Sequence, residues 1–121
     1  MAKKLLIYQD VVPVTAEAHG NSTLKQITSF EFARELRIAP ILISEFRRAC
    51  LDYPIVFITG EDQVPFPVVV LAVGDQENQY LDDQARWNAD YIPAFVRRYP
   101  FVFTKSPDDD QYYLCVDQHY G

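Results

Sequence analysis

Two adjacent arginines, Arg97 and Arg98, are the residues of this chain best suited to bind a ligand. Trp87 and Tyr91 precede them and Tyr99 follows them. An arginine offers a planar fork that binds a carboxylate or a phosphate, and a nearby aromatic ring can stack on a ligand. The simpler interpretation is structural: the arginines complement the C-terminal dipole of a short helix while Trp87 packs in the core. A binding site formed by Trp87, Tyr91, Arg97 and Arg98 is the functional alternative.

The other residues that could do catalytic or metal chemistry are scattered. His19 and His119 are the only histidines, and we expect both at the surface. Cys50 and Cys115 lack the paired spacing of zinc ligands, so we expect buried free thiols in a reducing compartment, with a disulfide left open. The run Asp108-Asp109-Asp110 lacks the alternating spacing of a calcium loop. We therefore expect no catalytic residue, no metal and no cofactor.

A further set of residues is expected to serve the fold. Glu45 suits the first turn of a helix, where the dipole favours an acid. Asp52 and Arg98 occupy related positions in two similar segments, which suggests an ion pair between them. Each segment contains a Tyr-Pro step that ends a helix. The expected structural residues are Glu45, Asp52, Tyr53, Pro54, Tyr99 and Pro100.

Charge and length limit the class of protein. The chain has 121 residues with a formal net charge of −6, which fits one domain over residues 1–121 and argues against a nucleic-acid partner. The acidic half is the second one, where residues 51–121 carry twelve acidic and four basic side chains. The N-terminus lacks the long apolar stretch of a secretory signal, and no stretch is long enough to span a membrane. We expect a cytoplasmic protein.

Short apolar runs separated by turn residues predict the elements. A helix is expected over Glu45–Asp52, capped by Ser44, with Phe46, Ala49 and Cys50 as its buried stripe. A second helix is expected over Ala94–Arg98, with Asp90 as its N-cap. Thr28–Leu36 is compatible with a strand or a helical turn, and Glu17–Ser22 has turn chemistry. The expected strands are Leu5–Tyr8, Val11–Val14, Ile55–Thr59, Pro67–Val73, Phe101–Thr104 and Tyr112–Val116.

The two halves of the chain share one plan. Tyr53-Pro54 and Tyr99-Pro100 recur 46 positions apart, each between a short predicted helix and two apolar strands. Two such helix-plus-hairpin units can form one antiparallel sheet with helices on one face. The sequence therefore predicts an α+β fold with a mostly antiparallel sheet.

Several of these stretches together resemble the SapC family of bacterial proteins. The resemblance is densest at Tyr91–Phe101 (YIPAFVRRYPF) and continues at Leu114–Asp117, and it covers most of the chain. Family members are generally longer, so the chain resembles their N-terminal part. The family name implies an association with bacterial surface layers, in conflict with the cytoplasmic expectation, and the family offers no catalytic residues to carry over.

Three functions follow as hypotheses. The first is a non-enzymatic accessory module that contacts a protein partner or itself, with Tyr112–Val116 as a β-prone strand that can pair with another chain if it lies at a sheet edge. The second is a domain that binds a small molecule or peptide through Trp87, Tyr91, Arg97 and Arg98. The third is an enzyme of unknown chemistry.

Overall fold

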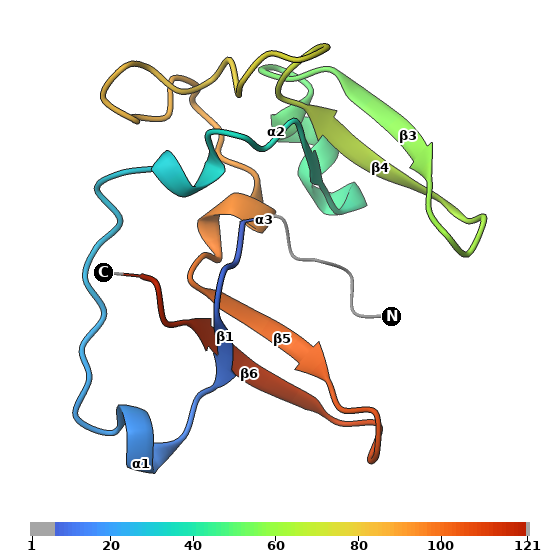
Figure 1. Cartoon of the computed structure of the whole chain (residues 1–121). Coiled ribbons are helices and arrows are strands. Elements are labelled where there is room, and N and C mark those ends of the chain that lie inside the picture. The colour runs from blue at the N-terminus through green and yellow to red at the C-terminus, as the bar shows by residue number, and fades with distance from the viewer. Residues whose placement is uncertain (1–6, 121) are drawn as a thin grey trace. The chain divides into compact units, whose positions relative to one another are not determined.

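The computed structural model describes residues 7–120, which form two compact units. Unit 1 consists of residues 7–27 and 98–120, and unit 2 of residues 28–97. Each contains one three-stranded antiparallel sheet; the described part of unit 1 adds one short helix and that of unit 2 several, which confirms the α+β class (Figure 1). The predicted strand Leu5–Tyr8 begins outside the described residues. The assignment of residues 1–121 to one domain stays a prediction.

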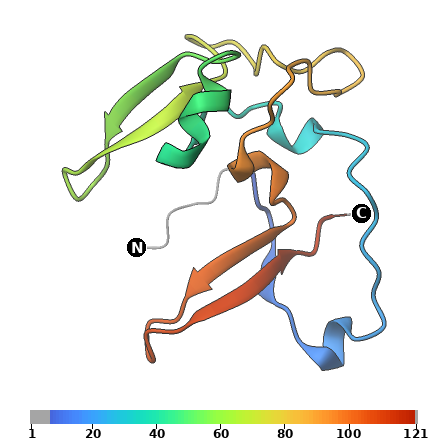
Figure 2. The same cartoon turned by 180° about the vertical axis from the view of Figure 1, so that it is seen from behind.

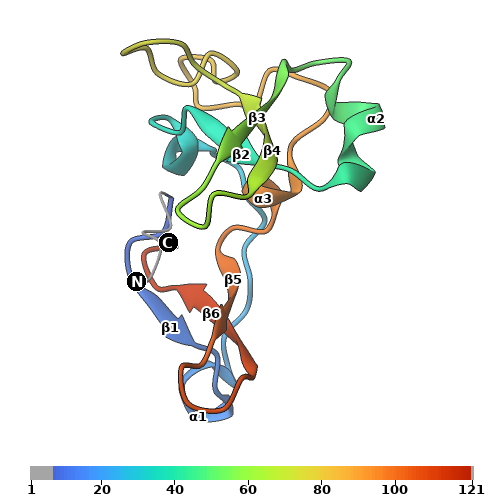
Figure 3. The same ribbon diagram turned by 90° about the vertical axis from the view of Figure 1, so that its right-hand side faces the viewer.

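The sheet of unit 2 has the strand order β2-β4-β3, with β2 at Ile38–Pro40, β4 at Pro65–Val70 and β3 at Ile55–Thr59 (Figure 3). Strand β3 has its predicted bounds, whereas β4 begins and ends earlier than the apolar run Pro67–Val73 suggested. The strand ends at Val70 because the amides of Leu71 and Ala72 both donate to the Arg37 carbonyl. Val68 and Val69 are fully buried at its centre.

The helices of unit 2 are shorter than predicted and differently capped. A 3-10 turn at Ile43–Glu45 (η2) leads into α2 at Phe46–Ala49, so Ser44 lies inside the turn and is not an N-cap. The helix α3 covers Ala94–Arg97, and the amide of Ala94 donates to the Glu45 carboxylate. Glu45, not Asp90, therefore caps α3. The ambiguous stretch Thr28–Leu36 contains a 3-10 turn at Glu31–Ala33 (η1).

The early end of α2 also corrects a prediction about the cysteines. Because the helix ends at Ala49, Cys50 is its C-cap, lies off the helical stripe and is exposed rather than buried. Cys115 is buried as expected, and both thiols are free.

The sheet of unit 1 has the order β1-β6-β5, with β1 at Val11–Pro13, β6 at Tyr112–Asp117 and β5 at Phe101–Lys105 (Figure 2). Strand β6 is central, so the strand expected to offer an edge is paired on both sides, and β5 provides the edge instead. The segment predicted as a turn, Glu17–Ser22, begins within α1 at Ala16–His19, because the Thr15 hydroxyl caps that helix at the Ala18 amide.

Both predicted hairpins are present, and each gains a third strand in the same way. The third strand, β2 or β1, pairs antiparallel with the second strand of its hairpin, β4 or β6. The two units thus share one strand topology, but they form two sheets rather than one. The hairpin turns carry the polar residues that the sequence placed there, at 60–64 and 106–111.

Candidate functional site

Glu45 is a buried carboxylate that joins two segments of unit 2. Its Oε1 accepts hydrogen bonds from the Tyr91 hydroxyl at 2.6 Å and from the Ala94 amide at 2.9 Å. Its Oε2 accepts from the Leu42 amide at 2.7 Å. One side chain therefore fixes the turn that starts η2 and the first turn of α3. This role is wider than the helix-dipole contact expected from the sequence.

The protonation states of this pair follow from the same contacts. Burial by itself would raise the pKa of Glu45, but the hydrogen bonds from Tyr91, Ala94 and Leu42 and the charge of Arg97 lower that pKa overall. Burial and the hydrogen bond to Glu45 raise the pKa of Tyr91. Glu45 is therefore the charged acceptor at neutral pH, and Tyr91 is the donor.

Two guanidinium groups lie against the Tyr91 ring. The Cζ of Arg97 is 5.5 Å from the ring centroid, and the Cζ of Arg48 is 5.6 Å from it. Arg97 also donates from Nε to the Ile92 carbonyl at 2.7 Å and from Nη2 to the Tyr91 hydroxyl at 3.3 Å. Sequence reasoning missed Arg48 in this role, because its contact with Tyr91 joins segments that no local spacing relates.

Trp87 belongs to the same unit, but its side chain contacts Tyr53 and Tyr80. Its Nε1 donates to the Tyr53 hydroxyl at 2.7 Å, and its ring stacks on Tyr80 with an interplanar angle of 12°. The Tyr53 hydroxyl in turn donates to the Tyr91 carbonyl, and burial raises the pKa of Tyr53. A continuous hydrogen-bonded path thus runs from Trp87 through Tyr53 to the Tyr91 backbone.

Asp52 holds the other side of the Tyr91 backbone. Its carboxylate accepts a hydrogen bond from the Tyr91 amide at 2.9 Å, and its carbonyl accepts from the Tyr80 hydroxyl at 2.8 Å. Arg98, its predicted ion-pair partner, belongs to unit 1, where it hydrogen-bonds the Tyr8 side chain. The ion pair of Asp52 with Arg98, and the place of Arg98 beside Tyr91, stay predictions.

Unit 1 contains a second buried carboxylate, Asp117, which sequence reasoning did not select. Both of its oxygens accept two hydrogen bonds. Oδ1 accepts from the amides of Asp10 and His119, and Oδ2 accepts from the Gln9 amide and the Tyr99 hydroxyl. Burial would raise the pKa of Asp117, but these donors lower it overall. The only signal in the sequence was an acid at the end of an apolar strand.

Tyr99 and the two Tyr-Pro prolines contact the second strands of the hairpins. Burial and the nearby Asp117 raise the pKa of Tyr99 to about 12. The Pro54 carbonyl accepts from the Val70 amide, and the Pro100 carbonyl accepts from the Asp117 amide. Each proline therefore supplies the carbonyl that starts its hairpin ladder.

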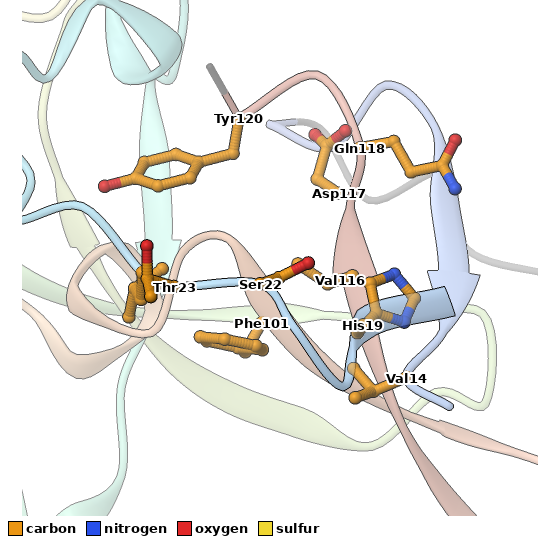
Figure 4. A pocket seen from close by; sticks show the side chains of 10 residues that line it. Val14, His19, Ser22, Thr23, Phe101, Val116, Asp117, Gln118 and Tyr120 are labelled. Atoms are coloured by element: carbon orange, nitrogen blue, oxygen red, sulfur yellow. The ribbon is translucent and has the colours of Figure 1, made fainter. Parts of the chain in front are cut away.

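A pocket of about 430 Å³ lies in unit 1 beside the sheet (Figure 4). Tyr120 and Phe101 face each other across it, and Val116 forms part of its wall. His19 also lines it, and the Nδ1 of this ring accepts from the Thr15 amide at 3.1 Å. In neutral His19 the proton therefore sits on Nε2. The pocket is lined mainly by apolar and uncharged groups.

One face of the unit 1 sheet exposes a row of apolar side chains next to this pocket. The register places Val14, Leu114 and Phe103 side by side across the three strands, and they are 38%, 40% and 67% exposed. Tyr112 extends the row along β6 and is 68% exposed. We call these four residues the open face. A set of exposed apolar side chains that are neighbours in space is typical of a contact surface.

Within residues 7–120, no group of three or more His, Cys, Asp and Glu side chains could hold a metal ion. The described helices also include none that is long and apolar enough to cross a membrane.

The fold and these contacts define an α+β protein with two structural carboxylates, an arginine-flanked tyrosine and an open apolar face. Comparison with protein-family models adds the family: the SapC model matches residues 14–121. The chain belongs to the SapC family. No curated protein and no solved structure matches it.

Proposed function

We propose that this SapC protein is a non-enzymatic interaction module that contacts a protein through the open face. The observation that carries the proposal is the exposed row Val14–Leu114–Phe103, with Tyr112 beside it. Burying such side chains against a partner contributes about 25 cal/mol for each Å² of apolar surface removed from water. The side chains best placed for acid–base work, Glu45 and Asp117, are already occupied by donors of their own unit.

Two further features support the proposal. The acidic turn 108–110 comes just before Tyr112 of the open face. It would favour a partner whose surface around the contact is basic or uncharged. Cys50 and Cys115 are free thiols, which supports a reducing compartment, and we place the proposed contact in the cytoplasm.

The test compares the native size of the full chain in extracts of the cells that produce it. The wild type is expected to run well above its own 14.0 kDa, and Leu114→Thr is expected to run at a smaller size than the wild type. Val56→Thr is the matched control, because Val56 is also a strand residue that is 40% exposed, but it lies in unit 2. If all three proteins run at the same size, the open face is not the contact surface.

The arginines at Tyr91 support a second candidate function, the binding of an anionic small molecule or peptide in unit 2. Among the described residues, neither Arg48 nor Arg97 forms an ion pair with a carboxylate, while both lie against Tyr91. A guanidinium without a carboxylate partner in an acidic protein is available for an anion. In this proposal Trp87 would belong to the same site, and the contribution of Arg98 stays a prediction.

Calorimetric titration with inorganic phosphate and with acetate tests this second function. Binding is expected to weaken at least tenfold in Arg97→Gln and in Arg48→Gln. Arg47→Gln is the control, since Arg47 is exposed on the same helix as Arg48 and makes no contact with Tyr91. Equal affinity in all three variants, or no binding of either anion, would exclude the site.

A further inference from the structure

We infer that a second copy of this chain joins unit 1 edge to edge with β5, in an antiparallel pair centred on Phe103, so that two open faces form one continuous surface. The inference goes beyond the proposed function, because the pairing enlarges the open face and does not cover it. Three observations carry it: the direction of the backbone groups of β5, the continuation of the apolar row, and the charges at the two ends of the strand.

The backbone of β5 presents its odd-numbered residues to the open edge. In an antiparallel ladder, residues alternate between those bonded to one neighbour and those turned to the other side. The Pro100 carbonyl accepts from Asp117 and the Ser106 amide donates to Gln111, so even-numbered residues face β6. Phe103 and Lys105 therefore turn their amides and carbonyls outward.

The outward amides and carbonyls of β5 in one copy can bond to the same groups in a second copy. With Phe103 on a two-fold axis, its amide and carbonyl bond to the carbonyl and amide of Phe103 in the second copy. The Lys105 amide then meets the Phe101 carbonyl of the second copy, and the reverse pair forms by symmetry. The Phe101 amide already donates to the Arg98 carbonyl at 2.8 Å, so it is not available to the Lys105 carbonyl of the second copy, and the pair has four backbone hydrogen bonds.

The same pairing joins two exposed apolar rows into one. Phe103 is the end of the row Val14–Leu114–Phe103, at the free edge of the sheet. Pairing across Phe103 places the two Phe103 rings side by side, a cross-strand contact that stabilises sheets. It also extends the sheet of unit 1 into a sheet shared by two copies, with the open faces continuous on one side.

The charges do not oppose this pairing. The single charged side chain of β5 is Lys105, and it forms an ion pair with Asp110 in its own hairpin. In the pair, Lys105 lies opposite Phe101 of the second copy, so no like charges face each other. The acidic turns at 106–111 lie at opposite ends of the pair. The strand also contains no proline and no second charge, the devices by which proteins commonly protect an edge.

Light scattering on the purified full chain, over a dilution series in reducing buffer, tests the partner. The mass is expected to rise with concentration from 14.0 kDa toward twice that value. Lys105→Pro removes an outward amide and keeps the open face, so it is expected to stay at 14.0 kDa. Thr59→Pro is the matched control at the equivalent outward position of β3, and it is expected to associate like the wild type.

Two charged substitutions at Phe103 test the register of the β5 pair. Phe103→Asp and Phe103→Lys each place like charges opposite each other on the two-fold axis, so each variant alone is expected to be a monomer. An equimolar mixture is expected to form a mixed dimer. Association of Lys105→Pro, loss of association in Thr59→Pro, or a monomeric mixture would overturn the inferred pairing. A purified wild type that stays monomeric, together with a large native size in extracts that depends on Leu114, would overturn only the inference and leave the proposed function standing.

Discussion

Equivalent rows of the two sheets differ in how much of their apolar surface is exposed. In unit 2 the row through β3 is Phe57–Pro67–Ile41, and in unit 1 the row through β5 is Phe103–Leu114–Val14. Phe57 and Phe103 occupy the same place in the internal repeat and have similar exposure. The rows diverge beyond them: Ile41 is buried, whereas Val14 and Leu114 are exposed.

The difference has a structural cause. In unit 2 the short connection from β2 to α2 places Phe46 against Phe57, with ring centroids 6.2 Å apart. In unit 1 the helix that follows β1, α1, has the sequence AEAH and no buried residue, so it offers no aromatic ring of this kind to Phe103. The row of unit 2 is therefore contacted by an aromatic side chain of its own helix, whereas the row of unit 1 stays exposed.

The two buried carboxylates extend the comparison. Glu45 has a nearby cation in Arg97, whereas Asp117 is stabilised by hydrogen bonds from three amides and one hydroxyl. Both groups have lowered pKa values, so both stabilise the fold in their charged forms.

Acid is expected to have the largest effect on stability because it acts on both carboxylates. A carboxylate whose pKa is lower in the folded state contributes stability above its unfolded pKa, near 4.5 for Glu45 and 3.8 for Asp117, and this stability is lost as the pH falls through the folded pKa. Urea unfolding between pH 7 and pH 2 should show constant stability to about pH 5 and a decline below it. A double variant, Glu45→Gln with Asp117→Asn, should decline less. An equal decline in both proteins would show that other groups cause the loss.

Asp117→Asn is expected to have the next largest effect, about 3 kcal/mol in the free energy of unfolding. The asparagine amide would turn a donor toward groups that are themselves donors. Chemical denaturation at pH 7 measures the change. A loss below about 1 kcal/mol would contradict the hydrogen bonding described for this carboxylate.

Glu45→Gln is expected to cost less, about 2 kcal/mol, since the remaining oxygen can still accept from Tyr91 and Ala94. Only the Leu42 amide then faces a donor. Chemical denaturation of Glu45→Gln and of Asp117→Asn under the same conditions shows which variant loses more free energy of unfolding. The reverse order would indicate that the charge of Arg97 matters more at Glu45 than the hydrogen bonds do.

The sequence was sufficient for the local elements and insufficient for the contacts between them. β-Branched and aromatic runs located β3 and β5, and the Tyr-Pro steps located the starts of both hairpins. Asp90 was a plausible cap for α3 by position, but the cap is Glu45, which is distant in sequence and brought close only by packing. The contact of Arg48 with Tyr91 and most of the hydrogen bonds to Asp117 also join residues that are distant in sequence, so the sequence did not predict them.

The choice of edge strand shows the same limit. Tyr112–Val116 has the composition of an exposed pairing strand, yet Val11–Pro13, about a hundred residues earlier, pairs with β6 and makes it central. Strand order depends on such distant pairings, and no local pattern in one sequence reports them.

The smallest expected effect compares the two equivalent phenylalanines. Phe57→Thr should lower the free energy of unfolding by about 1 kcal/mol more than Phe103→Thr does, because only Phe57 has an aromatic partner among the described residues. Both measurements should use a dilute chain, where association does not add to stability. Equal losses would mean that Phe46 does not close the row in unit 2.

Amide hydrogen exchange along β5, measured at low and high protein concentration, tests the central claim most directly. The amides of Val102 and Thr104 face β6 and are expected to exchange slowly at both concentrations. The amides of Phe103 and Lys105 face the open edge and are expected to exchange rapidly in the dilute chain and slowly in the concentrated one. Exchange at Phe103 and Lys105 that stays rapid at every concentration would contradict pairing through this edge.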